Sequence, residues 1–112
     1  MSEIVREDNA TYAASKGGIR QLTKALAVDW AKYGINVNAI GPGYIRTELT
    51  KPLWENDVFN AWVEKRTPLG RWGSPENLGH AAVFLASPAA DFITGQIIYI
   101  DGGFLSTMGP VC

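Results

Sequence analysis

The sequence predicts an α/β fold in which two parallel strands are joined by helices. Along its 112 residues the patterns follow the order helix, strand, two short helices, helix, strand. The last strand, residues 96–100, is apolar at every position after Gln96, which is typical of strands buried on both faces of a parallel sheet. A connection of this kind makes a right-handed crossover between parallel strands. Two strands alone make a poor sheet, so the pattern implies neighbouring strands that this chain does not contain.

The first helix is predicted for residues 11–33, because four apolar side chains recur every three or four positions and share one face. These are Ile19, Leu22, Leu26 and Trp30. Asn9 or Thr11 can cap the start of the helix, and Gly34 stands where a helix commonly stops. Residues 35–40 then alternate apolar and polar side chains, which predicts a strand that ends in a sharp loop at Gly41-Pro42-Gly43.

The middle of the chain predicts two short helices and then a longer one. Residues 47–65 are helical in pattern, but Pro52 and Asn56-Asp57 argue for a break. Ser74-Pro75-Glu76 is a strong helix start, because Ser caps, Pro suits the first turn and Glu favours the helix dipole. This helix is expected to run to about Ala86.

Composition excludes several classes of protein. Apolar residues make up 46% of the chain and charged residues 19%, as in globular domains. The net charge of -1 and the lack of a basic stripe argue against a nucleic-acid partner. No apolar run is long enough to span a membrane and the amino terminus lacks a signal-peptide block, so we expect a cytoplasmic protein. His80 has no cysteine or histidine partner at ligand spacing, so no metal site is predicted.

Tyr12 and Lys16 form the pair that carries chemistry. In a helix, residues four apart lie on one face. An ammonium some 4–5 Å from a phenolate is worth roughly 3–4 kcal/mol at an effective dielectric near 20. That lowers the pKa of the phenol from about 10 to roughly 7–8, so Tyr12 becomes a usable acid and base near neutral pH. The spacing by itself is also compatible with chance on an amphipathic helix.

Four motifs in order along the chain resemble the short-chain dehydrogenase/reductase family. They are Tyr12-Ala13-Ala14-Ser15-Lys16-Gly17-Gly18, Ile35-Asn36-Val37-Asn38-Ala39-Ile40-Gly41-Pro42-Gly43, Ile45-Arg46-Thr47 and Asp101-Gly102-Gly103. The resemblance implies the carboxy-terminal part of a Rossmann-type doubly wound parallel sheet. Residues 1–112 would then be a single partial domain.

The resemblance also implies roles for individual residues. Tyr12 would be the catalytic acid and base, and Lys16 would lower its pKa and bond the nicotinamide ribose of NAD or NADP. The cofactor-binding residues would be Tyr12, Lys16, Pro42, Gly43, Ile45 and Thr47. Most Pro-Gly pairs are plain loops, but the place of Pro42-Gly43 after a strand and before Thr47 favours a cofactor contact. Thr47 could equally be a plain helix cap.

A segment of about residues 47–73 would form the substrate lid, as it does in the family. Candidate substrate contacts in and beside it are Tyr44, Trp62, Arg71 and Trp72. Arg71 suits an anionic substrate, although loop structure and surface charge explain it too. The tryptophans also suit a core role.

The substrate implied is a small ketone or secondary alcohol. Met1-Ser2-Glu3, Lys65-Arg66-Thr67-Pro68, Arg71-Trp72-Gly73 and Asp91-Phe92 look most like gluconate 5-dehydrogenases and related sugar-acid reductases. That branch would interconvert 5-ketogluconate and gluconate. One alternative is a 3-oxoacyl-carrier-protein reductase-like enzyme. Another is a non-catalytic remnant that acts only by association.

Two features of the family have no counterpart in the sequence. No glycine-rich turn opens a helix, and family spacing puts the substrate-polarising serine before Met1. We therefore expect a chain that does not turn over by itself and in which cofactor binding is doubtful. An open strand edge further predicts a homo-oligomer or association with full-length relatives.

Overall fold

A computed structural model describes residues 10–106 of the chain, with side chains from residue 17 onward. The helices are α1 (Ala10–Trp30), α2 (Lys51–Trp54), α3 (Asp57–Arg66) and α4 (Pro75–Leu85), and the strands are β1 (Ala39–Pro42) and β2 (Ile97–Ile100). Short 3₁₀ turns follow α1 at Ala31–Tyr33, follow α4 at Pro88–Ala90, and follow β2 at Phe104–Ser106. No helix within residues 10–106 is long and apolar enough to cross a membrane.

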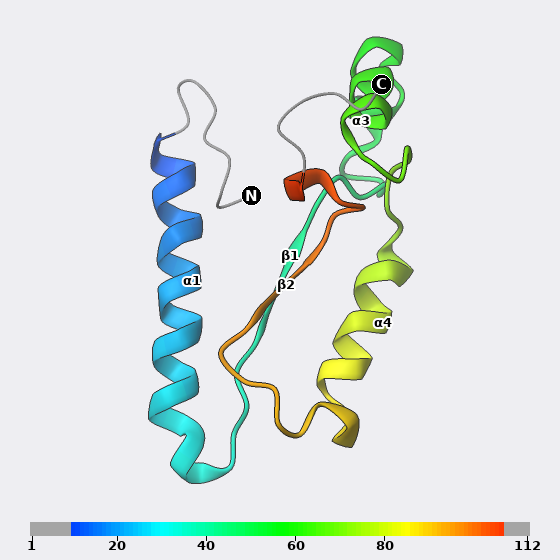
Figure 1. The fold of residues 1–112 in the computed structure, drawn as a ribbon. Coiled ribbons are helices and arrows are strands. Elements are labelled where there is room, and N and C mark those ends of the chain that lie inside the picture. The colour runs from blue at the N-terminus through cyan, green and yellow to red at the C-terminus, as the bar shows by residue number, and fades with distance from the viewer. Residues whose placement is uncertain (1–9, 107–112) are drawn as a thin grey trace.

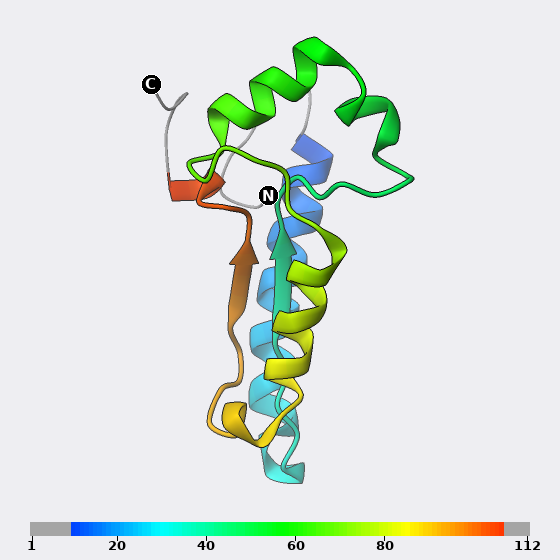
Figure 2. The ribbon, with the colours of Figure 1, turned by 90° about the vertical axis from the view of Figure 1, so that its right-hand side faces the viewer.

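The two strands pair in parallel, as the crossover pattern predicts. Ala39 lies opposite Ile97 and Pro42 opposite Ile100. Helix α1 lies on one side of the strands and α4 on the other (Figure 1). Seen from the side, β1 and β2 run together toward the end of the molecule that carries α2 and α3 (Figure 2). The α/β class and the order of the elements are therefore confirmed.

The predicted strand at residues 35–40 is wrong in its bounds, because β1 begins at Ala39 and includes Gly41 and Pro42. Before that point one backbone bond to the loop before β2 remains, from the Gly95 amide to the Val37 carbonyl at 2.7 Å, and side chains make the other bonds. The Asn36 amide donates to the carbonyls of Ala90 and Asp91, at 3.3 and 3.2 Å. The Asn38 amide donates to the Ile93 carbonyl at 3.0 Å. These side-chain bonds join the segment to the loop before β2.

Gly41 belongs to the strand rather than to the expected loop, since it pairs with Tyr99 in β2, whose ring lies against it. A Cβ built on Gly41 would lie 2.6 Å from a ring carbon of Tyr99. Only a residue without a side chain allows Tyr99 to lie across β1 in this way. Pro42 then closes the strand opposite Ile100.

The predicted helices are confirmed, but Thr11 does not cap the first one, because α1 already begins at Ala10; Asn9 lies outside the described residues. Asn56 caps α3, since its side-chain oxygen accepts from the Phe59 amide at 3.0 Å. Pro52, expected at the break, lies instead in the first turn of α2, where its missing N–H is harmless. Helix α4 begins after Ser74, whose backbone N–H donates to the Asn77 side-chain oxygen at 2.8 Å.

The tightest packing lies beyond the carboxyl ends of the strands. The Tyr44 ring is surrounded by four other rings with centroids 5.6–5.9 Å away, those of Phe59, Trp62, Trp72 and Phe104. Val63 is fully buried and Phe104 is 2% exposed. By contrast, Ile19 and Leu22 on α1 are 48% and 55% exposed. The aromatic cluster, defined as these five rings, thus fixes α3 and the following loop onto the strand ends.

Candidate functional site

The candidate site is the segment that leaves β1, residues 43–50. The Gly43 amide donates to the Ile100 carbonyl at 3.0 Å, which extends the strand pairing by one bond. Ile45 then forms an isolated parallel bridge with Gly73. This bridge anchors the segment at the carboxyl ends of parallel strands, where α/β folds bind ligands.

The bridge sets the direction of the Ile45 backbone groups. Gly73 donates to the Tyr44 carbonyl and accepts from the Arg46 amide, both at 2.9 Å. The N–H and C=O of the bridged residue itself therefore point away from Gly73. A Cβ on Gly73 would lie 2.7 Å from the Cδ1 atom of Ile45, so the two segments approach closely at this bridge.

Two threonines close the turn that follows Ile45. The Thr47 amide donates to Thr50 Oγ1 at 2.9 Å, and the Thr50 amide donates to Thr47 Oγ1 at 3.2 Å. The Thr50 hydroxyl lies 2.7 Å from the Ile45 carbonyl oxygen, to which it donates. Thr47 was a candidate helix cap, but α2 begins only after Thr50, so Thr47 closes the preceding turn instead.

Trp54 covers this turn from the side of α2. Its indole N–H donates to the Thr47 carbonyl at 3.0 Å. The Arg46 guanidinium lies 4.2 Å from the centre of the Trp54 ring, within the range of a cation–π contact. The Thr50 hydroxyl and the Trp54 indole thus stabilise this turn through separate hydrogen bonds.

Tyr12 and Lys16 lie in the first half of α1, where the four-residue spacing puts them on one helix face. The amino-terminal end of α1 lies at the same end of the sheet as the carboxyl ends of β1 and β2 (Figures 1 and 2). The side chains of both residues fall outside the described residues. Their catalytic roles stay predictions.

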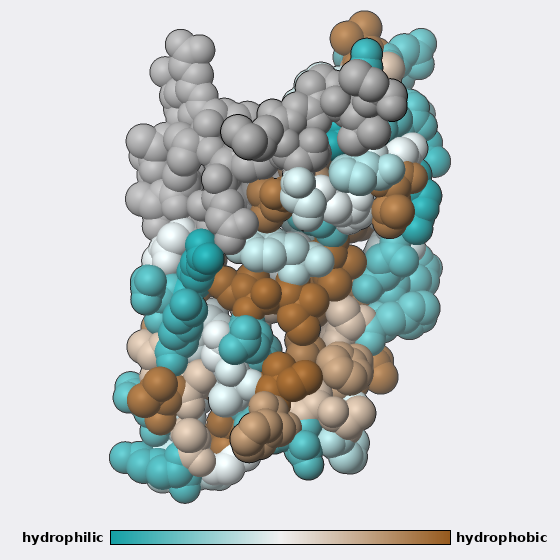
Figure 3. Space-filling view, in the orientation of Figure 1, coloured by the Kyte–Doolittle hydropathy of each residue, from teal (hydrophilic) through white to brown (hydrophobic). Residues whose placement is uncertain are grey.

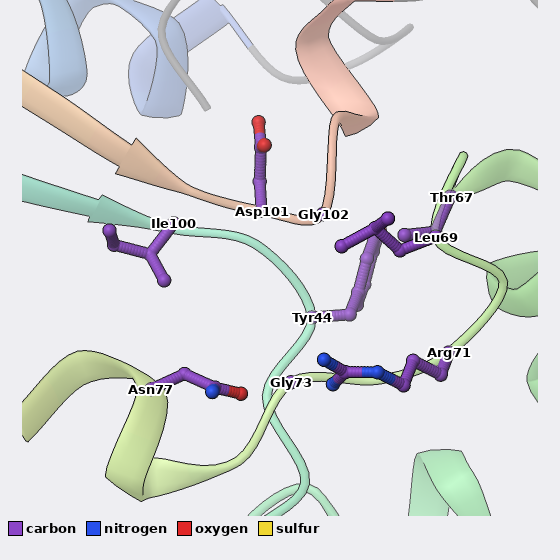
Figure 4. A pocket seen from close by; sticks show the side chains of 9 residues that line it. All are labelled: Tyr44, Thr67, Leu69, Arg71, Gly73, Asn77, Ile100, Asp101 and Gly102. Carbon is purple, nitrogen blue, oxygen red and sulfur yellow. The ribbon is translucent and has the colours of Figure 1, made fainter. Parts of the chain in front are cut away.

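A cavity of about 200 Å³ opens between the end of β2 and the loop after α3 (Figure 4). It is lined by Tyr44, Thr67, Leu69, Arg71, Gly73, Asn77, Ile100, Asp101 and Gly102. The Asp101 carboxylate points away from Asn77 and Arg71 in Figure 4 and accepts from the amides of Gly103 and Leu105, at 2.9 and 3.2 Å. Asn77 belongs to the first turn of α4, so the cavity lies toward α4, across the sheet from α1.

The candidate substrate residues divide into packed and open side chains. Trp72 is 8% exposed, and its indole N–H donates to Asn60 Oδ1 at 2.7 Å. Tyr44 lies at the centre of the aromatic cluster, and Trp62 is 38% exposed at its rim. The exposed guanidinium of Arg71 donates to the Trp72 carbonyl at 3.1 Å. Of the four, Arg71 and Trp62 are the more accessible to a substrate.

Sequence reasoning missed Thr50 and Asn60. The spacing of Thr47 and Thr50 is that of a reciprocal cap and could have pointed to the turn. Nothing local marks Asn60, because its partner Trp72 lies twelve residues away. No group of metal-ligating side chains is present among the residues described.

A family model described as Enoyl-(Acyl carrier protein) reductase matches residues 1–105. Nearly the whole chain is covered, so it belongs to the short-chain dehydrogenase/reductase family. Its fold is the carboxy-terminal part of that family's Rossmann-type sheet.

Two curated relatives show which members the chain resembles. It is 50% identical over 104 residues to 5-keto-D-gluconate 5-reductase of Escherichia coli K12, a match that covers 93% of this chain and 41% of the relative. It is 48% identical over 110 residues to 2-dehydro-3-deoxy-D-gluconate 5-dehydrogenase of Formosa agariphila, covering 97% of this chain and 42% of the relative. The chain therefore spans about two fifths of the length of these relatives.

A solved structure has the same arrangement of elements. The gluconate 5-dehydrogenase from Burkholderia cenocepacia in complex with NADP and tartrate superposes with a TM-score of 0.87 at 50% identity. The match covers 96% of this chain and 42% of that one. The arrangement of α1, the two strands and the segments between them is thus shared with an enzyme that binds NADP.

Proposed function

We propose that this chain forms the catalytic part of an NAD(P)-dependent oxidoreductase that interconverts the ketone and the secondary alcohol of a sugar acid. One observation carries the proposal. The Ile45–Thr47 segment lies at the carboxyl ends of parallel strands, at the same end of the sheet as the part of α1 that bears Tyr12 and Lys16. The similarity to 5-keto-D-gluconate 5-reductase favours 5-ketogluconate as the substrate.

The residues beside Ile45 fit a nicotinamide carboxamide, which has one acceptor oxygen and two N–H donors. The Ile45 amide has no hydrogen-bond partner among the described backbone of residues 10–106 and the side chains of residues 17–106, and it points away from Gly73, so it can donate. Thr47 Oγ1 can accept a further hydrogen bond. Pro42 and Gly43 would lie beside the ring. NADP is favoured because the Burkholderia cenocepacia enzyme is in complex with it.

Proton transfer is assigned to Tyr12. When bound in its reduced form, the nicotinamide would supply a hydride to the carbonyl carbon, and the Tyr12 phenol would donate its proton to the carbonyl oxygen. The Lys16 ammonium stabilises the phenolate that remains and so lowers the pKa of Tyr12. In the reverse direction the phenolate accepts the alcohol proton.

Substrate binding is assigned to residues 47–73 and to Tyr44 beside them. The guanidinium of Arg71 would pair with the substrate carboxylate, and the planar fork of arginine suits that partner. Trp62 would cover the sugar chain, while Tyr44 and Trp72 would shape the pocket through the aromatic cluster. The chain alone is expected to be inactive, because positioning and electrostatic terms dominate catalysis and the sequence carries no pyrophosphate-binding turn.

The test joins residues 1–112 to the preceding part of the Escherichia coli reductase. This grafted protein should oxidise NADPH with 5-ketogluconate, while the 112-residue chain alone should not. Tyr12→Phe should lower kcat at least about a hundredfold, the lower end of general acid–base contributions. Tyr33→Phe, at an exposed tyrosine after α1, is the matched control.

Three outcomes would contradict the proposal. Activity of Tyr12→Phe within tenfold of the grafted parent would exclude the catalytic role. Preference for a 3-oxoacyl thioester over 5-ketogluconate would favour the acyl reductase alternative. A folded graft without activity on either compound would favour a non-catalytic role.

A further inference from the structure

We infer that Thr50 is a positioning residue for the nicotinamide. Its hydroxyl would determine how Ile45 and Thr47 present their polar groups to the carboxamide. The inference rests on the proposed function and adds a residue to it. Thr50 would not touch the cofactor but act through Thr47.

The Thr50 hydroxyl has several partners within reach but a single proton. The Ile45 carbonyl is 2.7 Å away, whereas the carbonyl and the hydroxyl of Thr47 are both 3.2 Å away. The shortest contact takes the proton, so Thr50 Oγ1 donates to Ile45. Its lone pairs are then left for Thr47, whose amide donates to it at 2.9 Å.

This assignment determines the orientation of the Thr47 hydroxyl. Thr47 Oγ1 accepts from the Thr50 amide, and its own proton can be donated to Thr50 Oγ1, 3.2 Å away. One lone pair of Thr47 Oγ1 then remains. Thr47 would therefore present an acceptor, which suits the N–H₂ group of a carboxamide. Without the Thr50 hydroxyl, the Thr47 O–H rotates freely, so Thr47 Oγ1 no longer presents an acceptor in preference to a donor.

The turn has a second anchor, so removal of one hydroxyl is expected to leave the fold in place. The Trp54 indole holds the Thr47 carbonyl independently of Thr50. Thr50→Val keeps the shape of the side chain and removes its hydrogen bonds. Thr50→Ser keeps the hydroxyl and is the matched control. Thr50→Ala is a second deletion variant, in case the valine is not accommodated.

The first measurement uses the 112-residue chain itself. Thr47 donates its amide hydrogen to Thr50 Oγ1, so Thr50→Val should speed hydrogen exchange at Thr47 by about tenfold, the equivalent of one weak hydrogen bond. Thr50→Ser should leave the exchange rate at Thr47 within threefold of that of the parent. Exchange that is unchanged in both Thr50→Val and Thr50→Ala would overturn the inference.

The second measurement uses the grafted protein and NADP. Thr50→Val should weaken NADP binding by about tenfold, a size typical of one lost hydrogen bond. The 3-acetylpyridine analogue of NADP lacks the amide N–H₂ group. The affinity of Thr50→Val for this analogue should therefore lie within threefold of the affinity of the parent. An equal loss with both cofactors would indicate a merely structural role and overturn the inference.

The result also separates the inference from the proposed function. If the folded grafted parent binds no NADP, both are overturned. If the parent binds NADP and both deletion variants bind it equally well, only the role of Thr50 is overturned.

Discussion

The indole of Trp72 connects the proposed lid, residues 47–73, to Tyr44 beside it. Its ring packs 5.6 Å from Tyr44, while its N–H donates to Asn60 in α3 at 2.7 Å. Asn60 also donates to the exposed carboxylate of Glu64 at 3.2 Å. The Asn60–Trp72 bond therefore joins α3 to the strand-like segment that pairs with Ile45.

We predict that Asn60→Leu destabilises the chain by about 1–3 kcal/mol, because it leaves a buried indole N–H without an acceptor. The midpoint of thermal unfolding should fall by several degrees, since about 1 kcal/mol shifts it by roughly 4–8 °C in a small domain. Asn60→Asp keeps an acceptor oxygen and should unfold near the parent temperature. Equal midpoints for Asn60→Leu and the parent would show that the bond is not stabilising.

At the scale of elements, α4 is a helix whose first turn is set by polar side chains. The Ser74 amide donates to Asn77 Oδ1 at 2.8 Å, and the Ser74 hydroxyl lies 3.1 Å from the same oxygen. Next to it, the pKa of the Glu76 carboxyl is lowered, first by a hydrogen bond to its own backbone amide and then by one to the Ser74 hydroxyl. The ionised form of Glu76 is therefore favoured by the folded helix start.

This direction predicts how the stability of α4 depends on pH. A carboxyl whose pKa is lower in the folded than in the unfolded state stabilises the fold fully above the unfolded pKa. That contribution is lost as the pH falls through the lower, folded pKa. Helicity followed by circular dichroism should hence decrease in acid more steeply in the parent than in Glu76→Gln. The exposed Glu48→Gln is the control, and identical acid profiles for Glu76→Gln and the parent would refute the effect.

At the scale of the whole molecule, the chain is more open than a domain of its length. Its radius of gyration is 15.8 Å, compared with about 13 Å for a compact domain of this size. In the face shown in Figure 3, apolar residues gather over the middle of the molecule, in the region between α1 and α4. Exposed side chains include Ile19, Leu22 and Val28 on α1 and Val83 and Phe84 on α4.

We predict that the chain self-associates rather than remaining a monomer. Burial of a few hundred Å² of apolar surface is worth several kcal/mol at about 25 cal/mol per Å². That is large compared with a domain stability of about 5–15 kcal/mol. Light scattering at low micromolar concentration should give a mass above 12.2 kDa.

A pair of variants locates the association. Ile19→Lys combined with Leu22→Lys should reduce it, because both lie on the open face of α1. Val58→Lys, at an exposed position of α3, is the control. A stable, cooperatively unfolding monomer of the parent would contradict the prediction.

Local signals allowed most helices to be placed from the sequence. Asn56 and Ser74 cap helices through bonds to residues three positions away, and Gly34 ends the first helix with a left-handed conformation at φ 74°. The parallel pairing followed equally from the apolar run of the last strand. The family resemblance rested on motifs that are contiguous in the chain. All of these depend on interactions within a few residues or on the composition of a short segment.

Only the tertiary structure decided where β1 begins and what Trp72 and Thr50 contact. Asn36 and Asn38 find carbonyl partners 54–55 residues away, so a period-two pattern could not show that their side chains would bind the loop before β2. Trp72 finds its acceptor in another helix, and Thr50 matters because Gly73 has turned the Ile45 backbone toward it. Such partners are set by packing between segments distant in sequence, and the geometry of that packing exists only once the strands have paired.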